Sequence, residues 1–366
     1  MNNRTISEAD ITYVQEAVKA SPLQDFGIPH IVVDNIFPAD LVELINENWP
    51  QYEEGFAAEV PGNHILQIFR RNYQGLSQQR LRFWQTFNEI LWPYVVSAVA
   101  EAFAEPAVEV FGDLYYKHLT LDHPLTLMQA DPSYAVHSIH THFYHCPHWA
   151  FTMLLYVDPR DKLSQGTALH RLRSRGKADQ SQSSYLLDDI EWRTDVAMDT
   201  QHWLDPKKPD RIYQDQVSEY KCNRLFVFLD GPLALHSVPA DNPDHTPNPE
   251  RAHDGGRNAR RRILRSHVKI HHVPFYHKHS SLLPEPIEPV RYMRLMAPDA
   301  VLSAEDQLYR EKVLRPFFKE RVGAYARAVE RMQEARSVDR RSSLLERTAK
   351  RFRSVQLNWQ MVQRIP

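Results

Sequence analysis

Five histidines lie between positions 137 and 148, directly before an apolar run. Imidazole is the most common metal ligand among protein side chains, so the cluster indicates a metal site. His140 and His142 are two positions apart, and on a β-strand such residues point to the same side. A site for oxygen chemistry usually adds a carboxylate, but none occurs between Asp131 and Asp158. The sequence therefore predicts a metal site that lacks a neighbouring carboxylate.

The composition is that of an ordinary globular protein of 366 residues, of which 42% are hydrophobic and 25% charged. The formal net charge of -2 gives no reason to expect nucleic acid or an anionic membrane as a partner. Two cysteines, Cys146 and Cys222, are too few for a disulfide framework or a multi-cysteine zinc site. The sequence has no glycine-rich phosphate loop. It also has no apolar signal-peptide core or membrane-spanning run, so we expect a cytoplasmic protein.

The expected elements place helices before strands. Apolar spacing predicts helices in residues 7–20, 39–48 and 77–104, with a β-branched strand at 29–38. Further strands are expected at 125–128, 134–139, 149–157, 225–229 and 263–273. Because no helical pattern separates most of these strands, they predict an antiparallel sandwich or barrel.

Two regions lie outside this series of strands. Residues 171–216 are polar and charged, which favours a lid over the barrel or, equally, a plain surface loop. Residues 303–306 resemble a helix-capping box, and residues 323–353 are strongly basic. An arginine-rich helix of this kind is more often a solvated surface than a nucleic-acid patch.

The order of these features resembles the Fe(II)/2-oxoglutarate-dependent oxygenase superfamily, of the prolyl-hydroxylase-like type. The features that carry the resemblance are a turn before His140, a turn at Gly166, a strand followed by His236, and an arginine-rich final strand at 260–265. The resemblance covers residues 29–273.

The resemblance implies a mainly β fold with flanking helices. Residues 1–275 would form a double-stranded β-helix of the jelly-roll or cupin type, with an N-terminal helical layer. Residues 276–366 would form a C-terminal helical extension. The implied activity is that of an oxidoreductase, a dioxygenase that uses Fe(II) and 2-oxoglutarate to hydroxylate a C–H bond. The substrate, a small molecule or a peptide, is not revealed by the sequence.

The resemblance also implies metal ligands. His140 and His236 would bind the iron, but His142 stands where the family pattern has Asp or Glu. His142 could ligate and give a three-histidine facial site, which is the favoured alternative. It could instead stand back and leave a coordination position vacant, or the chain could have lost oxygenase chemistry.

Two residues are expected to contact the co-substrate. By resemblance, Arg262 would hold the far carboxylate of 2-oxoglutarate, and Tyr134 would be a further contact. The planar guanidinium can bind a carboxylate through two hydrogen bonds, whereas lysine offers a point charge. Side chains alternate along a strand, so Arg261 and Arg265 share the face opposite to Arg262, and the sequence leaves the register open.

Two other classes of protein stay open. Residues 140–145 superficially match the H-x-H-x-D-H motif of metallo-β-lactamase-like hydrolases, in which a metal activates water, but Tyr144 replaces the aspartate. The third class is a catalytically inactive β-barrel binding protein, which metal analysis would separate from both enzymes. We expect His137, His145 and His148 to have no catalytic part.

Overall fold

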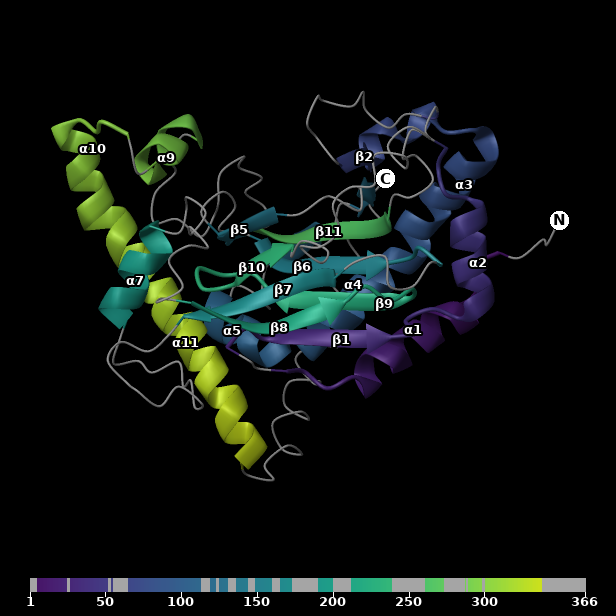
Figure 1. The fold of residues 1–366 in the computed structure, drawn as a ribbon, viewed down its shortest axis with the longest axis horizontal. Helices are drawn as coiled ribbons and strands as arrows, with labels where there is room; N and C mark the ends of the chain where they lie inside the picture. Colours follow the sequence, from purple (N-terminus) through teal and green to yellow (C-terminus); the bar gives the residue numbers. More distant parts are fainter. Residues whose placement is uncertain are drawn as a thin grey trace, which may run out of the picture.

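A computed structural model gives the fold of the chain (Figure 1). It describes residues 5–24, 27–51, 54, 65–112, 119–122, 125–130, 136–143, 149–159, 165–172, 190–199, 212–238, 261–272, 287, 289–297 and 300–337. At its centre lie two antiparallel sheets, joined by inward contacts such as the 3.3 Å hydrogen bond between the Tyr156 and Thr167 hydroxyls.

The two sheets have seven and four strands in the described residues. The larger sheet has the order β1-β9-β6-β11-β4-β2, with β3 pairing to β11, and the smaller has the order β5-β10-β7-β8. The strands of the larger sheet are β1 (His30–Asp34), β2 (Ile65–Phe69), β3 (Leu119–Asp122), β4 (Leu125–Ala130), β6 (Trp149–Tyr156), β9 (Arg224–Leu229) and β11 (Arg261–His272). Those of the smaller sheet are β5 (Val136–His140), β7 (Gln165–Leu172), β8 (Ile212–Glu219) and β10 (Leu235–Val238).

The eight strands from β4 to β11 have the order β4-β11-β6-β9 in one sheet and β5-β10-β7-β8 in the other. This is the strand order of a jelly roll, in which the chain crosses repeatedly between two facing sheets. The predicted antiparallel fold with flanking helices is confirmed. The apolar, β-branched runs that predicted strands at 149–157, 225–229 and 263–273 correspond to β6, β9 and β11.

The pairing register divides the larger sheet into two faces. Thr152 on β6 lies opposite His267 on β11 and Phe228 on β9, and all three point toward the smaller sheet. The neighbouring residue Phe151 lies opposite Val268 and points the other way, because side chains alternate along a strand. One face of the sheet therefore points inward, and the other is available for helices.

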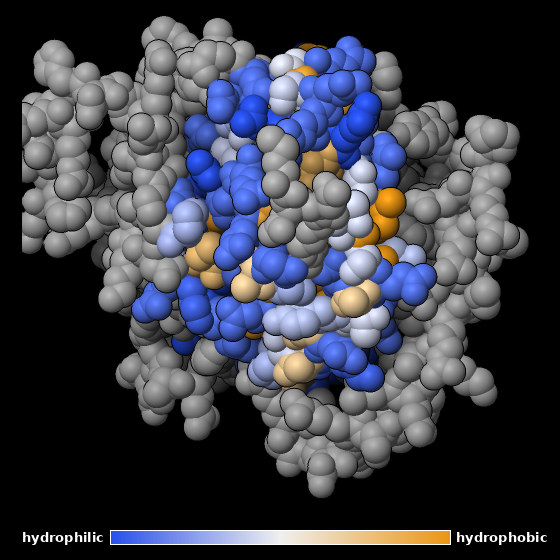
Figure 2. Space-filling view, turned by 90° about the vertical axis from the view of Figure 1, so that its right-hand side faces the viewer, coloured by the Kyte–Doolittle hydropathy of each residue, from blue (hydrophilic) through white to orange (hydrophobic). Residues whose placement is uncertain are grey.

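Helices cover that other face. They are α1 (Glu8–Ala20), α2 (Ala39–Glu47), α3 (Gln78–Thr86), a π-helical turn η3 (Phe87–Leu91), α4 (Trp92–Ala102) and α5 (Ala104–Phe111), with a 3-10 helix η2 (Arg70–Gly75) before α3. Phe103, between α4 and α5, packs on Phe151 with ring centroids 5.2 Å apart. The predicted N-terminal helical layer is confirmed, and the outer surface on the side of α2 and α3 is mainly hydrophilic (Figure 2).

The later helices are α7 (Ile190–Asp199), α9 (Pro289–Met296), α10 (Ala304–Tyr309), a π-helical turn η8 (Arg310–Leu314) and α11 (Arg315–Ser337). The predicted cap is confirmed, because the Ser303 side chain accepts a hydrogen bond from the Asp306 backbone N–H at 3.1 Å. Of the basic segment, Arg327 and Arg331 pair with Glu109 of α5. Residues 338–353 lie outside the described part of the chain.

The last helix packs on the sheets. The Tyr325 hydroxyl of α11 donates a 3.0 Å hydrogen bond to the Leu229 carbonyl at the end of β9. Any Cβ at Gly231 would lie 2.4 Å from the Tyr325 ring, so only glycine fits beside that ring. A domain division at residue 275 stays a prediction, but in the described residues α11 is packed directly against the turn after β9.

The predicted lid at 171–216 has a smaller extent than expected. Residues 171–172 belong to β7 and residues 212–216 to β8, so the excursion is confined to 173–211. Its described part is α7. Asp195 of this helix forms a 2.7 Å salt bridge with Arg315 of α11. Its role as a lid stays a prediction. Among the described helices, none is long and apolar enough to cross a membrane.

Candidate metal centre

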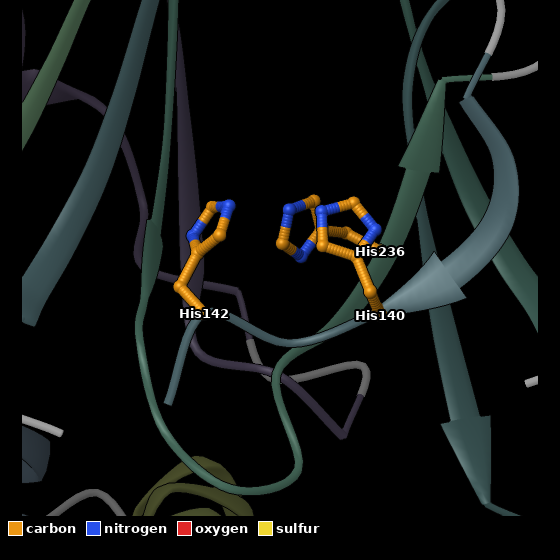
Figure 3. Close-up of side chains that lie close together, drawn as sticks. All are labelled: His140, His142 and His236. Carbon is orange, nitrogen blue, oxygen red and sulfur yellow. The ribbon is translucent and has the colours of Figure 1, made fainter. Parts of the chain in front are cut away.

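Three histidines converge between β5 and β10 (Figure 3). His140 is the last residue of β5 and lies opposite His236 on β10, and His142 follows two residues after the strand ends. The ring centroids are 4.3 Å apart for His140 and His236, 4.5 Å for His142 and His236, and 5.4 Å for His140 and His142. One nitrogen from each ring lies within 4.8 Å of the others. The structure thus brings together the three residues that the sequence singled out.

His236 is in the form that a metal requires. Its Nδ1–H donates to the Ala234 carbonyl at 3.0 Å, which leaves a lone pair on Nε2. Burial lowers the pKa of His236 well below its usual value, and the neighbouring His140 and His142 lower it further. A buried imidazole that stays neutral at neutral pH keeps a lone pair with which it can bind a metal.

A carboxylate is present after all, supplied from another strand. Asp230 directly follows β9, and its Oδ1 lies 3.1 Å from Nδ1 of His142. Thr152 donates a 2.7 Å hydrogen bond to the other carboxylate oxygen. Burial raises the pKa of Asp230 to about 7, although the hydrogen bond from Thr152 opposes this shift. The sequence analysis missed Asp230; the signal was a charged residue at the end of an apolar strand.

His267 of β11 belongs to the same group. Its Nδ1 lies 3.1 Å from the Thr152 hydroxyl, and its ring stacks on Trp149 with centroids 4.0 Å apart. His142, Asp230 and His267 form a second group whose polar atoms lie within 4.8 Å of one another. Two groups of candidate ligands therefore share the His142 ring.

His170 is a further histidine that the sequence analysis did not single out. It lies on β7, and its Nε2 is 2.8 Å from the Ser237 hydroxyl. Burial lowers the pKa of His170 to about 4, and the nearby His140 lowers it further. The available signal was its place four residues after Gly166, in what the structure shows to be β7.

Arg262 is on the helix-facing side of β11, and its expected role needs correction. Its guanidinium donates a 2.8 Å hydrogen bond to Asn46 of α2 and lies 5.7 Å from the Trp49 ring. Arg261 and Arg265 alternate with it and share the inward face with His267. The structure therefore does not bring Arg262 to the three histidines.

Tyr134, the other expected co-substrate contact, lies outside the described residues, and so do Tyr144 and His145 of the hydrolase motif. Of the histidines expected to have no catalytic part, His148 also lies outside them, and only the backbone of His137 is described, in β5. The chemistry of the site rests on three imidazoles, which suit Fe, Zn, Cu and Ni ions.

No model of a known protein family matches the sequence, and no curated protein does. Solved structures similar to the chain include a prolyl 4-hydroxylase from Phytophthora capsici, with 12% identity, coverage of 100% of this chain and 96% of that chain, and a TM-score of 0.38. A 2OG-Fe(II) oxygenase family oxidoreductase from Burkholderia pseudomallei has 7% identity, 73% and 93% coverage and a TM-score of 0.35. A Pseudomonas putida prolyl-4-hydroxylase has 11% identity, 71% and 98% coverage and a TM-score of 0.34. At these TM-scores the similarities do not assign a family or a function to this chain.

Proposed function

We propose that the protein is a non-haem Fe(II)- and 2-oxoglutarate-dependent oxygenase that hydroxylates a C–H bond of a small molecule or peptide. The observation that carries the proposal is the convergence of His140, His142 and His236 where β5 meets β10, within a jelly-roll strand order. The fold proposed with it is a double-stranded β-helix. The three histidines would be the metal ligands.

The donor set fits a ferrous ion with an anionic co-substrate. Three neutral imidazoles would hold the ion and would leave its charge of +2 intact. The dianionic 2-oxoglutarate would neutralise that charge. When bound, the iron and 2-oxoglutarate supply the oxidising chemistry: one oxygen atom of O2 goes to the substrate carbon and the other to succinate, with release of carbon dioxide.

We assign the contact with the far carboxylate of 2-oxoglutarate to Arg265. It lies on the inward face, two residues from His267, whose ring is 4.8 Å from that of His142. Two residues along a strand span about 7 Å, whereas the six residues from His267 to Arg261 span about 20 Å. A five-carbon diacid is much shorter than the second distance. Arg265 already donates to an amide oxygen, that of Gln67, at 2.9 Å.

The remaining inward residues would shield the site from water. Phe228 packs on His236 with ring centroids 4.7 Å apart, and Phe226 lies next to it on the same face of β9. Both are buried. Exclusion of water protects a reactive oxidant from side reactions and strengthens the charge pairing with Arg265.

The test is a two-step anaerobic titration of the full-length protein. Fe(II) is added first and 2-oxoglutarate second, and the expected result is the visible charge-transfer band of the iron chelate. The variant His236→Ala should lose stoichiometric iron, because two remaining ligands hold a metal weakly. The matched control His170→Gln removes a neighbouring histidine that is outside the set and should keep the band.

The other outcomes of the titration would each favour a different class of protein or a different ligand set. Iron or zinc that binds without a 2-oxoglutarate band would favour the metal hydrolase. If neither metal binds, the protein is a binding barrel and the oxygenase proposal fails. Iron retained at full stoichiometry in His236→Ala would remove His236 from the ligand set.

A further inference from the structure

The His142 ring lies between two polar groups. Figure 3 shows one ring nitrogen directed toward His140 and His236 and the other directed away from them. The second nitrogen, Nδ1, lies 3.1 Å from Oδ1 of Asp230 and 3.1 Å from the hydroxyl of Thr152. The candidate metal position is therefore on one side of the ring and a buried carboxylate on the other.

The hydrogen bonds around Nδ1 of His142 favour one tautomer of the ring. Thr152 has one hydroxyl proton, and it goes to Oδ2 of Asp230 at 2.7 Å. When Asp230 is ionised it only accepts hydrogen bonds, so the proton between His142 and Asp230 is then on Nδ1 of the imidazole. The His267 Nδ1–H can donate to Thr152 at 3.1 Å in the same arrangement. Nε2 of His142 then keeps its lone pair and can bind a metal.

The alternative is that His142, Asp230 and His267 hold a metal themselves, since they form a two-histidine, one-carboxylate set. The Thr152 hydroxyl oxygen argues against this. It lies 2.7 Å from Asp230, 3.1 Å from His142 and 3.1 Å from His267. Metal–ligand bonds of about 2.0–2.2 Å to all three residues would require the threonine to leave this place. The group is arranged as a hydrogen-bond network.

We propose that Asp230 is a positioning residue that, together with Thr152, fixes His142 in the Nδ1-protonated form and directs its Nε2 to the metal between His140 and His236. The inference rests on the metal site of the proposed function. A carboxylate behind a ligating imidazole fixes the orientation of the ring and makes it a stronger ligand. The carboxylate that the sequence lacks at position 142 thus acts through the imidazole instead of on the metal.

The first test measures metal affinity with Co(II), whose visible spectrum reports its ligands. The variant Asp230→Leu has a similar shape but no acceptor, and its dissociation constant for Co(II) should rise about 10- to 100-fold. Two variants at Thr152 distinguish the effect of the hydroxyl group from that of side-chain shape. Thr152→Ser keeps the hydroxyl and should bind Co(II) as the wild type does, whereas Thr152→Val keeps the shape and should bind Co(II) more weakly. His267→Gln should leave the affinity within about twofold, because in this network His267 donates to Thr152 and is not a metal ligand. Thermal melting without metal checks that each variant is folded.

The second test reads the tautomer directly in metal-free protein. Nitrogen-15 spectra of labelled histidine should show His142 protonated at Nδ1 in the wild type and a mixture of tautomers in Asp230→Leu. Unchanged affinity and an unchanged tautomer in Asp230→Leu would overturn the proposal. An equal loss of affinity in His267→Gln would overturn it too, because Asp230 and His267 would then be ligands.

The two proposals fail in different ways. If wild-type protein binds neither Co(II) nor Fe(II), the proposed oxygenase function fails. The tautomer of His142 in the metal-free protein still decides whether Asp230 controls that ring.

Discussion

The two faces of strand β6 differ in what surrounds them. Leu155 points to the helices and is fully buried opposite Leu225 and Leu264, which are fully buried as well. Leu154, one residue earlier, points inward opposite Arg265 and is only partly buried. The helix-facing side is apolar core, whereas the inward side carries histidines, Arg265 and the Asp230–Thr152 pair. The apolar core and the candidate metal centre therefore lie on opposite faces of one sheet and can be changed separately.

The largest expected effect on stability comes from a substitution on the helix-facing side of β6. Leu155→Ala should lower the free energy of unfolding by about 3–4 kcal/mol, because it leaves a cavity in a fully buried cluster. The matched variant Leu154→Ala, on the inward face, should cost about 1–2 kcal/mol, because the side chain is only partly buried. Denaturant unfolding of both variants measures the difference. Equal losses would mean that the two faces contribute equally to stability.

The next effect concerns acid sensitivity on the inward side. The pKa of His170 is about 4 in the folded chain and near 6.5 when unperturbed. Between these values the unfolded chain binds more protons, so the free energy of unfolding falls as the pH falls below 6.5 and levels off near 4. The size of this contribution is of the order of 3 kcal/mol.

The variant His170→Gln isolates this contribution. It cannot titrate but can still hydrogen bond to Ser237, so its unfolding free energy should depend less on pH between 6.5 and 4. The raised pKa of Asp230 acts in the opposite direction, since its stability contribution is lost as the pH rises toward about 7, and it is present in both proteins. Parallel pH curves for the two proteins would rule out His170 as the source.

The smallest expected effect is on the affinity for 2-oxoglutarate, and it compares arginines on the two faces of β11. Arg265→Gln should raise the dissociation constant for 2-oxoglutarate about 10- to 100-fold, because the charged partner of the carboxylate is lost. Arg262→Gln, on the helix-facing side, should change it less than about threefold while losing its hydrogen bond to Asn46. Anaerobic titration of the iron-loaded variants measures both. The reverse result would restore Arg262 as the co-substrate residue.

Most of the elements could be predicted because they depend on patterns that are local in the chain. His236 is far from His140 and His142 in the chain, and it was added to them by the resemblance. Apolar β-branched runs marked β6, β9 and β11. Spacing by two residues marked His140 and His142 as a pair, but His142 lies after the end of β5 and not on the strand as expected. Asp230 could not be found from local patterns, since it is 88 residues from His142 and meets it only in the folded chain, where it follows β9 beside Thr152 of β6. The sequence left the register of β11 open, and only the resemblance pointed to Arg262, because both faces of that strand are largely buried and polarity does not reveal the register.

The contact between Gly231 and Tyr325 limits how the chain can be shortened. The turn that begins at Asp230 leads within six residues to His236, and the Tyr325 ring lies where a side chain at position 231 would be. Removing α11 would take away the surface that holds this turn in place. A shortened chain that keeps this turn in place must therefore retain the part of α11 that carries Tyr325.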